Sequence, residues 1–196
     1  MIIGYAPSSA LVVVDMQYDF ADPEGSLYVR GGEGIVTGIA AEIAGAQAAG
    51  ATVVYTQDWH PEHTPHFAQD GGIWPVHCVA DSPGAALVPG LPVVGPVMHK
   101  GTGSEDGYSG FSEVDLASGE RKGTQLSTLL DEAGVMDVTV VGLAGDWCVK
   151  ATALDGVKLG YTVTVPLALT RFVNLEDGDE AQAVDEMREA GVTVLE

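Results

Sequence analysis

The sequence predicts an α/β domain with a mainly parallel central sheet. Apolar runs rich in β-branched residues alternate with helix-forming stretches along the 196 residues, a pattern typical of strands that are joined by helices. The runs are continuously apolar, as strands buried on both faces are. A chain of this length can build one domain with a substantial core. We therefore expect residues 1–196 to form a single domain, a Rossmann-like three-layer sandwich.

Each expected strand is a short apolar run. The first reads ALVVVD, the second ATVVYTQD and the third PVVGPVMHK. In chain order, the strands are expected at residues 10–15, 51–58, 92–100, 138–142, 161–165 and 192–195. The helix-forming stretches between them are expected at residues 35–49, 125–133, 148–158 and 179–190. Residues 59–91 show little periodicity, and loops of that length are usually functional or disordered.

The chain is strongly acidic, with 28 Asp and Glu against 8 Lys and Arg and a net charge of -20. Nucleic acids and anionic membranes require basic surfaces, so the composition excludes both as partners and favours a small neutral or cationic ligand. A secretion signal and an apolar run long enough to span a bilayer are both missing. We expect a cytoplasmic protein with free thiols. A Cys78–Cys148 disulfide is the alternative. The sequence leaves open whether the protein forms a homo-oligomer.

Four reactive or chelating side chains stand at the ends of expected strands. Asp15 ends the first strand, Asp58 the second and Lys100 the third, and Cys148 follows the fourth. In an open parallel sheet, the ligand crevice lies beyond the carboxyl ends of the strands. A cap or a solvated strand end explains each residue taken alone. Their convergence at one edge predicts a reactive site.

Cys148 is expected where the strand over residues 138–142 gives way to a helix. Unpaired backbone N–H groups at such a point stabilise a thiolate and can hold an oxyanion. This position favours a nucleophile. A buried cysteine that only fills space in the core is the alternative.

The loop over residues 59–91 carries four histidines, His60, His63, His66 and His77. In the extended Asp58-Trp59-His60 segment, the carboxylate and the imidazole lie on the same side. Together with further histidines they form a mixed nitrogen and oxygen donor set, which suits one divalent metal ion such as zinc, iron or manganese. The spacing leaves open which histidines bind, and a merely polar, exposed loop is the alternative.

Aromatic residues are candidates for the wall of a pocket at the same edge. They are Phe20, Trp59, Trp74 and Tyr108, and packing against the core is their alternative role. The glycine-rich segment 101–111, GTGSEDGYSGF, lacks the Gly-Lys-Ser/Thr ending of a phosphate loop. We interpret it as a lid or wall of the site.

With these residues assembled, the chain resembles the nicotinamidase/pyrazinamidase branch of the isochorismatase-like cysteine hydrolases. The likeness extends over nearly the whole chain and rests on the ordered motifs LVVVDMQYDF, GSLYV, TQDWHPEHTPHF, IWPVHCVADSPGA, KGTGSEDGYSGF and GLAGDWCV. Isochorismatases proper typically lack the metal motif and the nucleophilic cysteine. The resemblance implies metal-dependent hydrolysis of nicotinamide to nicotinate and ammonia in NAD salvage, and of pyrazinamide to pyrazinoate, through a thioester.

The resemblance also implies roles for individual residues. It implies a catalytic triad of Asp15, Lys100 and Cys148. The implied metal ligands are Asp58, His60 and His77, with His66 a better match than His63 for a further histidine. The implied oxyanion hole, near a cis peptide, consists of backbone N–H groups at Ala144, Gly145 and Cys148. Phe20 and Trp74 match residues that enclose the pyridine ring, and Tyr108 is a looser match in the pocket wall.

Three residues depart from the family pattern. Tyr18 stands where Asn is common, Gly145 where Thr is common, and Trp147 where His or Tyr often precedes the nucleophile. The amide substrate is therefore less fixed than the reaction class, and a related amidase for another small amide or carbamoyl compound is the alternative. A non-catalytic metal-binding protein, with cysteines that respond to oxidation, would leave the convergence of Asp15 and Lys100 on Cys148 unexplained.

Overall fold

A six-stranded parallel sheet lies at the centre of the computed structural model, which describes residues 3–196. Its strand order is β3-β2-β1-β6-β7-β8. The strands are β1 (Ser9–Val14), β2 (Thr52–Asp58), β3 (Val97–Lys100), β6 (Asp137–Gly142), β7 (Thr162–Pro166) and β8 (Thr193–Leu195). A separate antiparallel hairpin is formed by β4 (Ser112–Val114) and β5 (Arg121–Gly123).

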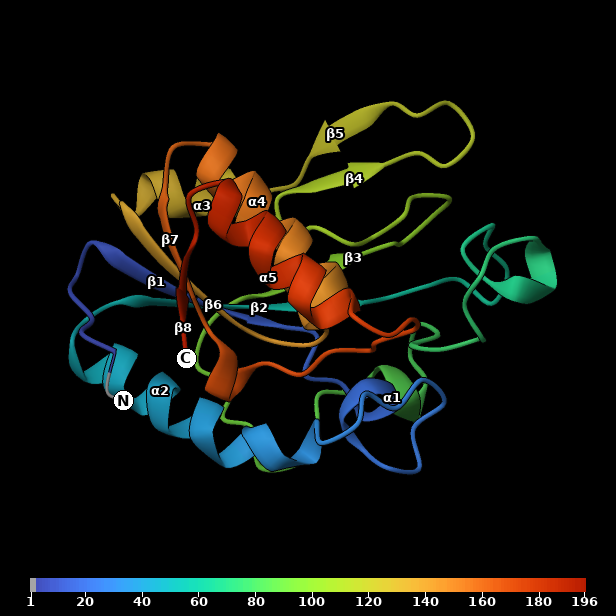
Figure 1. Cartoon of the computed structure of the whole chain (residues 1–196), viewed down its shortest axis with the longest axis horizontal. Coiled ribbons are helices and arrows are strands. Elements are labelled where there is room, and N and C mark those ends of the chain that lie inside the picture. Colours follow the sequence, from blue (N-terminus) through green and yellow to red (C-terminus); the bar gives the residue numbers. More distant parts are fainter. Residues whose placement is uncertain (1–2) are drawn as a thin grey trace.

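Helices cover both faces of the sheet (Figure 1). The short α1 (Tyr18–Ala21) and the long α2 (Val36–Ala48) lie on one side, and α3 (Leu126–Glu132), α4 (Lys150–Lys158) and α5 (Asp179–Glu189) lie on the other. Two apolar clusters, one on each face, fill the spaces between sheet and helices. The three-layer α/β architecture expected from the sequence is confirmed.

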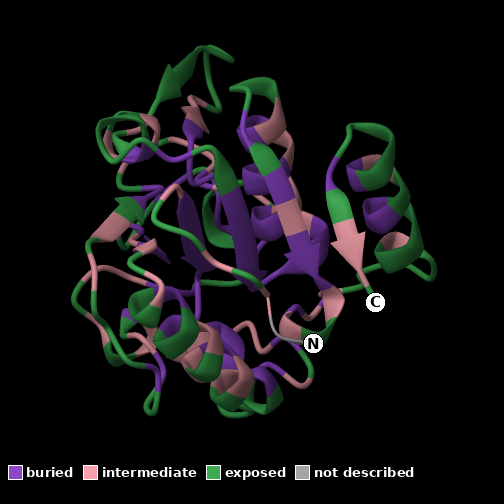
Figure 2. Cartoon of the chain, turned by 90° about the vertical axis from the view of Figure 1, so that its left-hand side faces the viewer, coloured by how far each residue is buried: buried purple, intermediate pink, exposed green. Residues whose placement is uncertain are grey.

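The central strand β1 shows why its sequence is continuously apolar. Val12 and Val14 belong to the cluster beneath α3 to α5, whereas Leu11 and Val13 belong to the cluster beneath α2. All of these side chains are fully buried, because helices cover both faces of the sheet and β1 lies between β2 and β6. Figure 2 shows the same distribution, with buried strands inside and exposed residues on the outer helix faces.

The structure corrects the expected elements in three places. The expected strand 92–100 is reduced to Val97–Lys100, because Pro92 and Pro96 lack the N–H that a ladder requires. The helix expected from Cys148 begins instead with one π-helical turn, Gly145–Val149, and α4 starts at Lys150. The β4–β5 hairpin is a further element that the apolar pattern did not indicate. Other boundaries shift by one residue.

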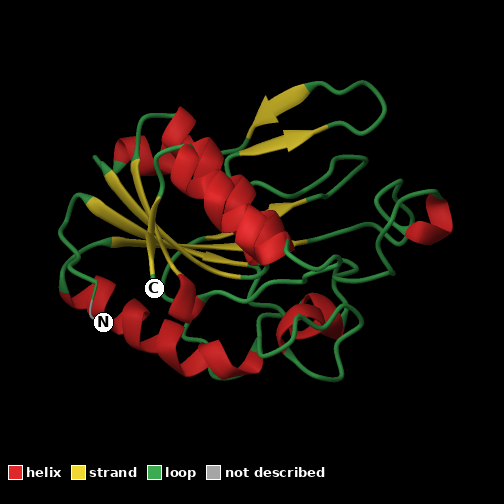
Figure 3. Ribbon diagram, viewed as in Figure 1, coloured by secondary structure: helices red, strands yellow, loops and turns green. Residues whose placement is uncertain are grey.

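The chain order places a crevice beside β1. The chain runs outward from β1 to β2 and β3, then returns to β6 on the opposite side of β1. Ligands bind at such a switch point, beyond the carboxyl ends of the strands. Figure 3 shows the long loops gathered at that end of the sheet. Among residues 3–196, no helix has the length and apolar character that crossing a bilayer would require.

Candidate active site

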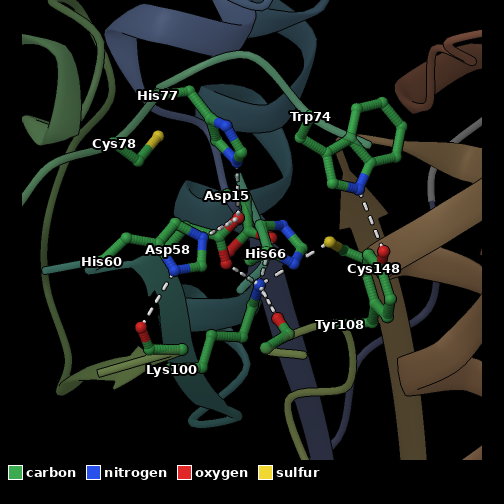
Figure 4. A network of polar contacts seen from close by, with 12 residues as sticks. Asp15, Asp58, His60, His66, Trp74, His77, Cys78, Lys100, Tyr108 and Cys148 are labelled. Carbon is green, nitrogen blue, oxygen red and sulfur yellow. Dashed lines mark hydrogen bonds and ion pairs between the residues drawn. The ribbon is translucent and has the colours of Figure 1, made fainter. Parts of the chain in front are cut away.

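The Lys100 ammonium lies at the centre of the four strand-end residues (Figure 4). Its Nζ is 2.7 Å from Asp15 Oδ2 and 3.6 Å from Cys148 Sγ, and it also donates to Asp58 Oδ1 and to the carbonyl of Gly107. Lys100 is only 1% exposed, and a buried charge is tolerated only when it is paired and hydrogen-bonded. The structure therefore brings together the four side chains that the strand-end rule selected.

Asp15 is turned into the crevice by its backbone. Its φ is 48°, a left-handed conformation that ends β1. The Asp15 N–H still donates to the Thr56 carbonyl at 3.2 Å, and the Thr56 hydroxyl donates to Asp15 Oδ1 at 2.7 Å. One carboxylate oxygen is thus fixed by β2, while the other faces Lys100.

The two aspartates on Lys100 have opposite proton affinities. Burial raises the pKa of Asp15 to about 6, although Lys100 opposes this shift. Burial also disfavours the ionised form of Asp58, but Lys100 and the neighbouring His60 and His77 outweigh it and hold the pKa well below its usual range. Divergent pKa values in one site separate a group that exchanges protons from one that stays charged. The directions of the two shifts therefore favour Asp15 as the group that exchanges a proton and Asp58 as the group that stays charged.

Cys148 lies inside the π-helical turn that follows β6. The sequence favoured a thiolate stabilised by backbone N–H groups, but burial raises the pKa of this thiol well above its usual value, and nearby Lys100 only partly compensates. Its resting form is therefore the thiol, and attack by its sulfur requires a base. Cys78 and Cys148 are both free thiols.

The backbone before Cys148 corrects one expected oxyanion donor. The Gly145 N–H donates to the Arg171 carbonyl at 2.7 Å, so it is already engaged. This leaves the backbone N–H groups of Ala144 and Cys148 as the remaining expected donors. The peptide bond between Leu143 and Ala144 is cis. A Cβ at position 145 would overlap the ring of Phe172, which explains why this chain carries glycine there.

Three buried histidines form a compact cluster beside Asp58. One ring nitrogen from each of His60, His66 and His77 lies within 4.8 Å of the others. His60 Nδ1 donates to the Gly101 carbonyl at 2.9 Å and His77 Nδ1 donates to the Pro75 carbonyl at 2.7 Å. These bonds place a proton on Nδ1 of each ring and leave Nε2 as the atom that faces Asp58. The two Nε2 atoms lie 3.6 and 3.8 Å from Asp58 Oδ2.

This cluster fits a divalent metal ion. Within residues 3–196, His60 Nε2 is buried without a hydrogen-bond partner, and such an orphaned atom is costly unless a ligand occupies it. Burial lowers the pKa of His66 to about 3, with neighbouring His60 reinforcing the effect, so this imidazole is neutral. Imidazole and carboxylate donors together suit several divalent metals. His63 lies elsewhere, with its side chain 78% exposed and paired with Asp70.

An aromatic cavity opens next to the thiol. The predicted Phe20, Trp74 and Tyr108 line it, and the Trp74 indole N–H donates to the Tyr108 hydroxyl at 2.9 Å. Trp59 is not among the lining residues, because its ring stacks on His99 at 4.1 Å. The full lining is Phe20, Leu27, Val29, Asp58, His66, Trp74, His77, Tyr108, Ala144, Trp147, Cys148 and Val173.

Several lining residues were not assigned to the pocket from sequence. Trp147 packs edge-on against Trp74, with ring centroids 4.8 Å apart. Val173 reaches the cavity because Asp146 accepts hydrogen bonds from the Val173 and Asn174 N–H groups, at 3.0 and 2.8 Å. Trp147 precedes the cysteine directly, and Leu27 and Val29 lie in the GSLYV motif, so these signals were present in the sequence. Nothing local indicates Val173.

The buried Asp15, Lys100 and Cys148 group, carried by a three-layer α/β sandwich, is the arrangement that a cysteine hydrolase would require. Comparison with known families gives the finer assignment, because the isochorismatase domain matches residues 9–196. The chain belongs to the isochorismatase family. This result confirms the resemblance that the ordered motifs indicated.

Relatives within the family are similar over nearly their whole length. A nicotinamidase of Escherichia coli is 37% identical over 206 residues, which cover 96% of this chain and 94% of the relative. The crystal structure of PnC1 from L. infantum in complex with nicotinate has a TM-score of 0.87 at 36% identity, covering 100% of this chain and 96% of that one. The structure of pyrazinamidase of Pyrococcus horikoshii in complex with zinc has a TM-score of 0.86 at 37% identity, covering 97% and 99%.

Proposed function

We propose that this protein hydrolyses nicotinamide to nicotinate and ammonia through a thioester on Cys148, and acts on pyrazinamide in the same way. This reaction belongs to NAD salvage. The observation that carries the proposal is the Lys100 ammonium, which contacts Asp15, Asp58 and Cys148 at the base of an aromatic cavity. The nicotinamidase and the nicotinate complex among the similar proteins support this choice of amide.

In the acylation step, Asp15 acts as the base. A carboxylate oxygen of Asp15 lies within 4.8 Å of Cys148 Sγ, and with a pKa near 6 the carboxyl is ionised at neutral pH. Asp15 takes the thiol proton as Sγ bonds to the carboxamide carbon. The protonated carboxyl then gives this proton to the amide nitrogen as the C–N bond breaks and ammonia leaves. Lys100 stabilises the negative charge on both the sulfur and the carboxylate.

The second step restores the free enzyme. Asp15 accepts a proton from water while the hydroxyl oxygen bonds to the thioester carbon, and the C–S bond breaks as the acid is released. The proton on Asp15 returns to the sulfur. In both steps the negative oxygen is held by the backbone N–H groups of Ala144 and Cys148, and one such donor typically contributes a hundredfold or more in turnover.

The aromatic wall and the histidine cluster bind the substrate. Phe20 and Trp74 enclose the pyridine ring, with Tyr108 at the side, so a planar neutral ring is favoured over an aliphatic amide. Asp58, His60, His66 and His77 hold the divalent metal, with zinc supported by the pyrazinamidase complex. When bound, the metal supplies a Lewis-acidic position for the ring nitrogen, which orients the carboxamide toward Cys148.

The test is ammonia release from nicotinamide by the purified protein, measured with and without prior chelation and beside Cys148→Ala. We expect release from the zinc-loaded parent and a loss of at least about a thousandfold in the variant, because the nucleophile is removed. Metal content is the control and should be unchanged in Cys148→Ala. Release that persists in this variant would contradict the thioester, and no release from the parent would contradict nicotinamide as the substrate.

A further inference from the structure

A buried glutamine completes the sheet where β1 stops short of β2. The β1–β2 pairing ends at Val14 and Thr56, two residues before Asp58. Beyond that point the Gln17 side chain takes the place of a strand. Its Oε1 accepts from the Asp58 N–H at 2.8 Å, and its Nε2 donates to the Asp58 carbonyl at 2.8 Å.

The Gln17 amide is fully committed to backbone groups. Its second N–H donates to the Ala85 carbonyl at 2.9 Å, and the residue is 0% exposed. Only one orientation of the amide satisfies all three bonds, since the flipped form would face an N–H toward an N–H and an oxygen toward two carbonyls. The side chain therefore offers one acceptor and two donors in a fixed arrangement, as a peptide group of a neighbouring strand would.

We propose that Gln17 is the positioning residue for Asp58, and that it holds this carboxylate where it serves Lys100 and the histidine cluster together. Asp58 Oδ1 accepts from Lys100, whereas Oδ2 lies 3.6 and 3.8 Å from the ring nitrogens of His60 and His77. A carboxylate that faces two partners needs a fixed backbone, because a small rotation would favour one partner over the other. The inference rests on the proposed function in taking Asp58 as a metal ligand.

The same residue connects Asp58 to the segment that carries the base. The Gln17 N–H donates to the Asp15 carbonyl at 2.7 Å. Gln17 thus joins the turn after β1 to the end of β2 and to the Pro83–Ala85 turn. Groups that orient metal ligands typically contribute between about 10- and 100-fold in metal affinity.

A matched control stands in the neighbouring residue. The Gln57 side chain is also buried, and its Nε2 donates to the same Ala85 carbonyl at 2.9 Å. Within the described residues, the two glutamines differ in that the Gln57 side chain makes no hydrogen bond to the Asp58 backbone. Gln57→Met therefore removes a buried amide without releasing Asp58.

The experiment measures zinc affinity of the full chain by competition with a chromophoric chelator. We expect Gln17→Met to weaken zinc binding by about 10- to 100-fold and Gln57→Met to leave it within about twofold, while thermal unfolding reports the stability that each variant loses. Gln17→Glu is the second variant, for use if Gln17→Met does not fold. It keeps the acceptor for the Asp58 N–H but loses both donors, and we expect it to weaken zinc binding too.

Zinc affinity that stays at the parent value in Gln17→Met, or in Gln17→Glu if that variant replaces it, would overturn the proposal. An equal loss in Gln57→Met would overturn it as well, because the effect would then be general destabilisation. Asp58→Ala separates this failure from that of the proposed function. If Asp58→Ala binds zinc normally, the ligand assignment itself is wrong; if it loses zinc while Gln17→Met does not, only the positioning role fails.

Discussion

Asp15 and Asp58 share one ammonium, yet their carboxyl groups differ in what they can do with a proton. Asp15 is buried and accepts a hydrogen bond from the Thr56 hydroxyl, and burial raises its pKa to about 6. Asp58 faces Lys100 and two imidazoles, and these partners hold its pKa well below its usual range despite burial. In the proposed reaction this difference favours Asp15 over Asp58 for proton transfer, because a base works best with a pKa near the operating pH.

This assignment predicts how turnover depends on pH. A base must be ionised to accept the thiol proton, and the pKa of Asp15 is raised, so kcat/KM should rise with pH through a midpoint near 6. Asp15→Asn should remove that rising limb and lower kcat by about a hundredfold or more. Initial rates of ammonia release between pH 4.5 and 8 check both outcomes. A flat profile in the parent would rule out Asp15 as the titrating base.

The residues of the site that stand at or just after the ends of strands were predictable from the sequence. The rule that parallel strands end at one edge brought Asp15, Asp58, Lys100 and Cys148 together, and the structure places them in contact, while their roles stay predictions. The engaged N–H of Gly145 was not predictable, because its acceptor lies 26 residues onward at Arg171. Gln17 escaped for the same reason, since its partners are backbone groups 41 and 68 residues away.

At the scale of elements, the segment after β3 supports both halves of the site. The Gly101 carbonyl accepts from His60, and the Gly107 carbonyl accepts from Lys100. Tyr108 then reaches the cavity and accepts from Trp74. The sequence predicted a lid or wall here, and the Tyr108 side chain does form part of the cavity wall. What the pattern did not indicate is that two backbone carbonyls of this segment hold the reactive residues.

Gly101 is a position in this segment where a larger side chain would disturb the site. It has a φ of +64°, and a Cβ there would overlap the His60 imidazole. Gly101→Ala should therefore displace His60 and weaken zinc binding by about tenfold or more. Chelator competition measures this effect. Gly119→Ala is the control, because Gly119 also has a positive φ of +72° but a Cβ there would meet nothing within 4 Å. An equal loss of zinc affinity in both variants would contradict a specific effect of the new Cβ on His60.

The same scale shows where sequence patterns identify secondary structure. Strands such as β1 and β6 were found because both faces are buried, which requires a continuous apolar run. The β4–β5 hairpin was missed because its strands have three residues each, and all three residues of Arg121–Gly123 are exposed. No apolar periodicity marks such a short, solvated ribbon. The short β3 was overextended because valines before Pro96 resemble a strand in composition alone.

For the molecule as a whole, the net charge of -20 is the dominant feature of the surface. Excess like charge destabilises a compact state through self-repulsion while keeping the protein soluble. Salt screens this repulsion, with a Debye length of about 10 Å at 0.1 M and about 3 Å at 1 M. The stability of this fold is therefore coupled to ionic strength much more strongly than that of a protein with balanced charge.

We expect the thermal unfolding midpoint at pH 7 to rise as NaCl increases from 0.05 to about 1 M, because repulsion among exposed carboxylates is screened over this range. Calorimetry or circular dichroism follows the transition. The control is the same series near the pI of about 4.2, where the net charge is small and the rise should largely vanish. A thermal unfolding midpoint that stays unchanged or falls with salt at pH 7 would show that charge repulsion does not destabilise the fold significantly.

The carboxylate of Asp58 has a consequence for how the two halves of the site communicate. One oxygen faces the Lys100 ammonium and the other faces the histidines, so Lys100 and an ion held by the histidines would share a single negative charge. An ion bound on the histidine side would reduce the attraction felt by Lys100 and would favour its pairing with Asp15 and Cys148. Such coupling is reciprocal. We therefore expect the supply of metal to act as a thermodynamic control on the reactivity of the Cys148 sulfur.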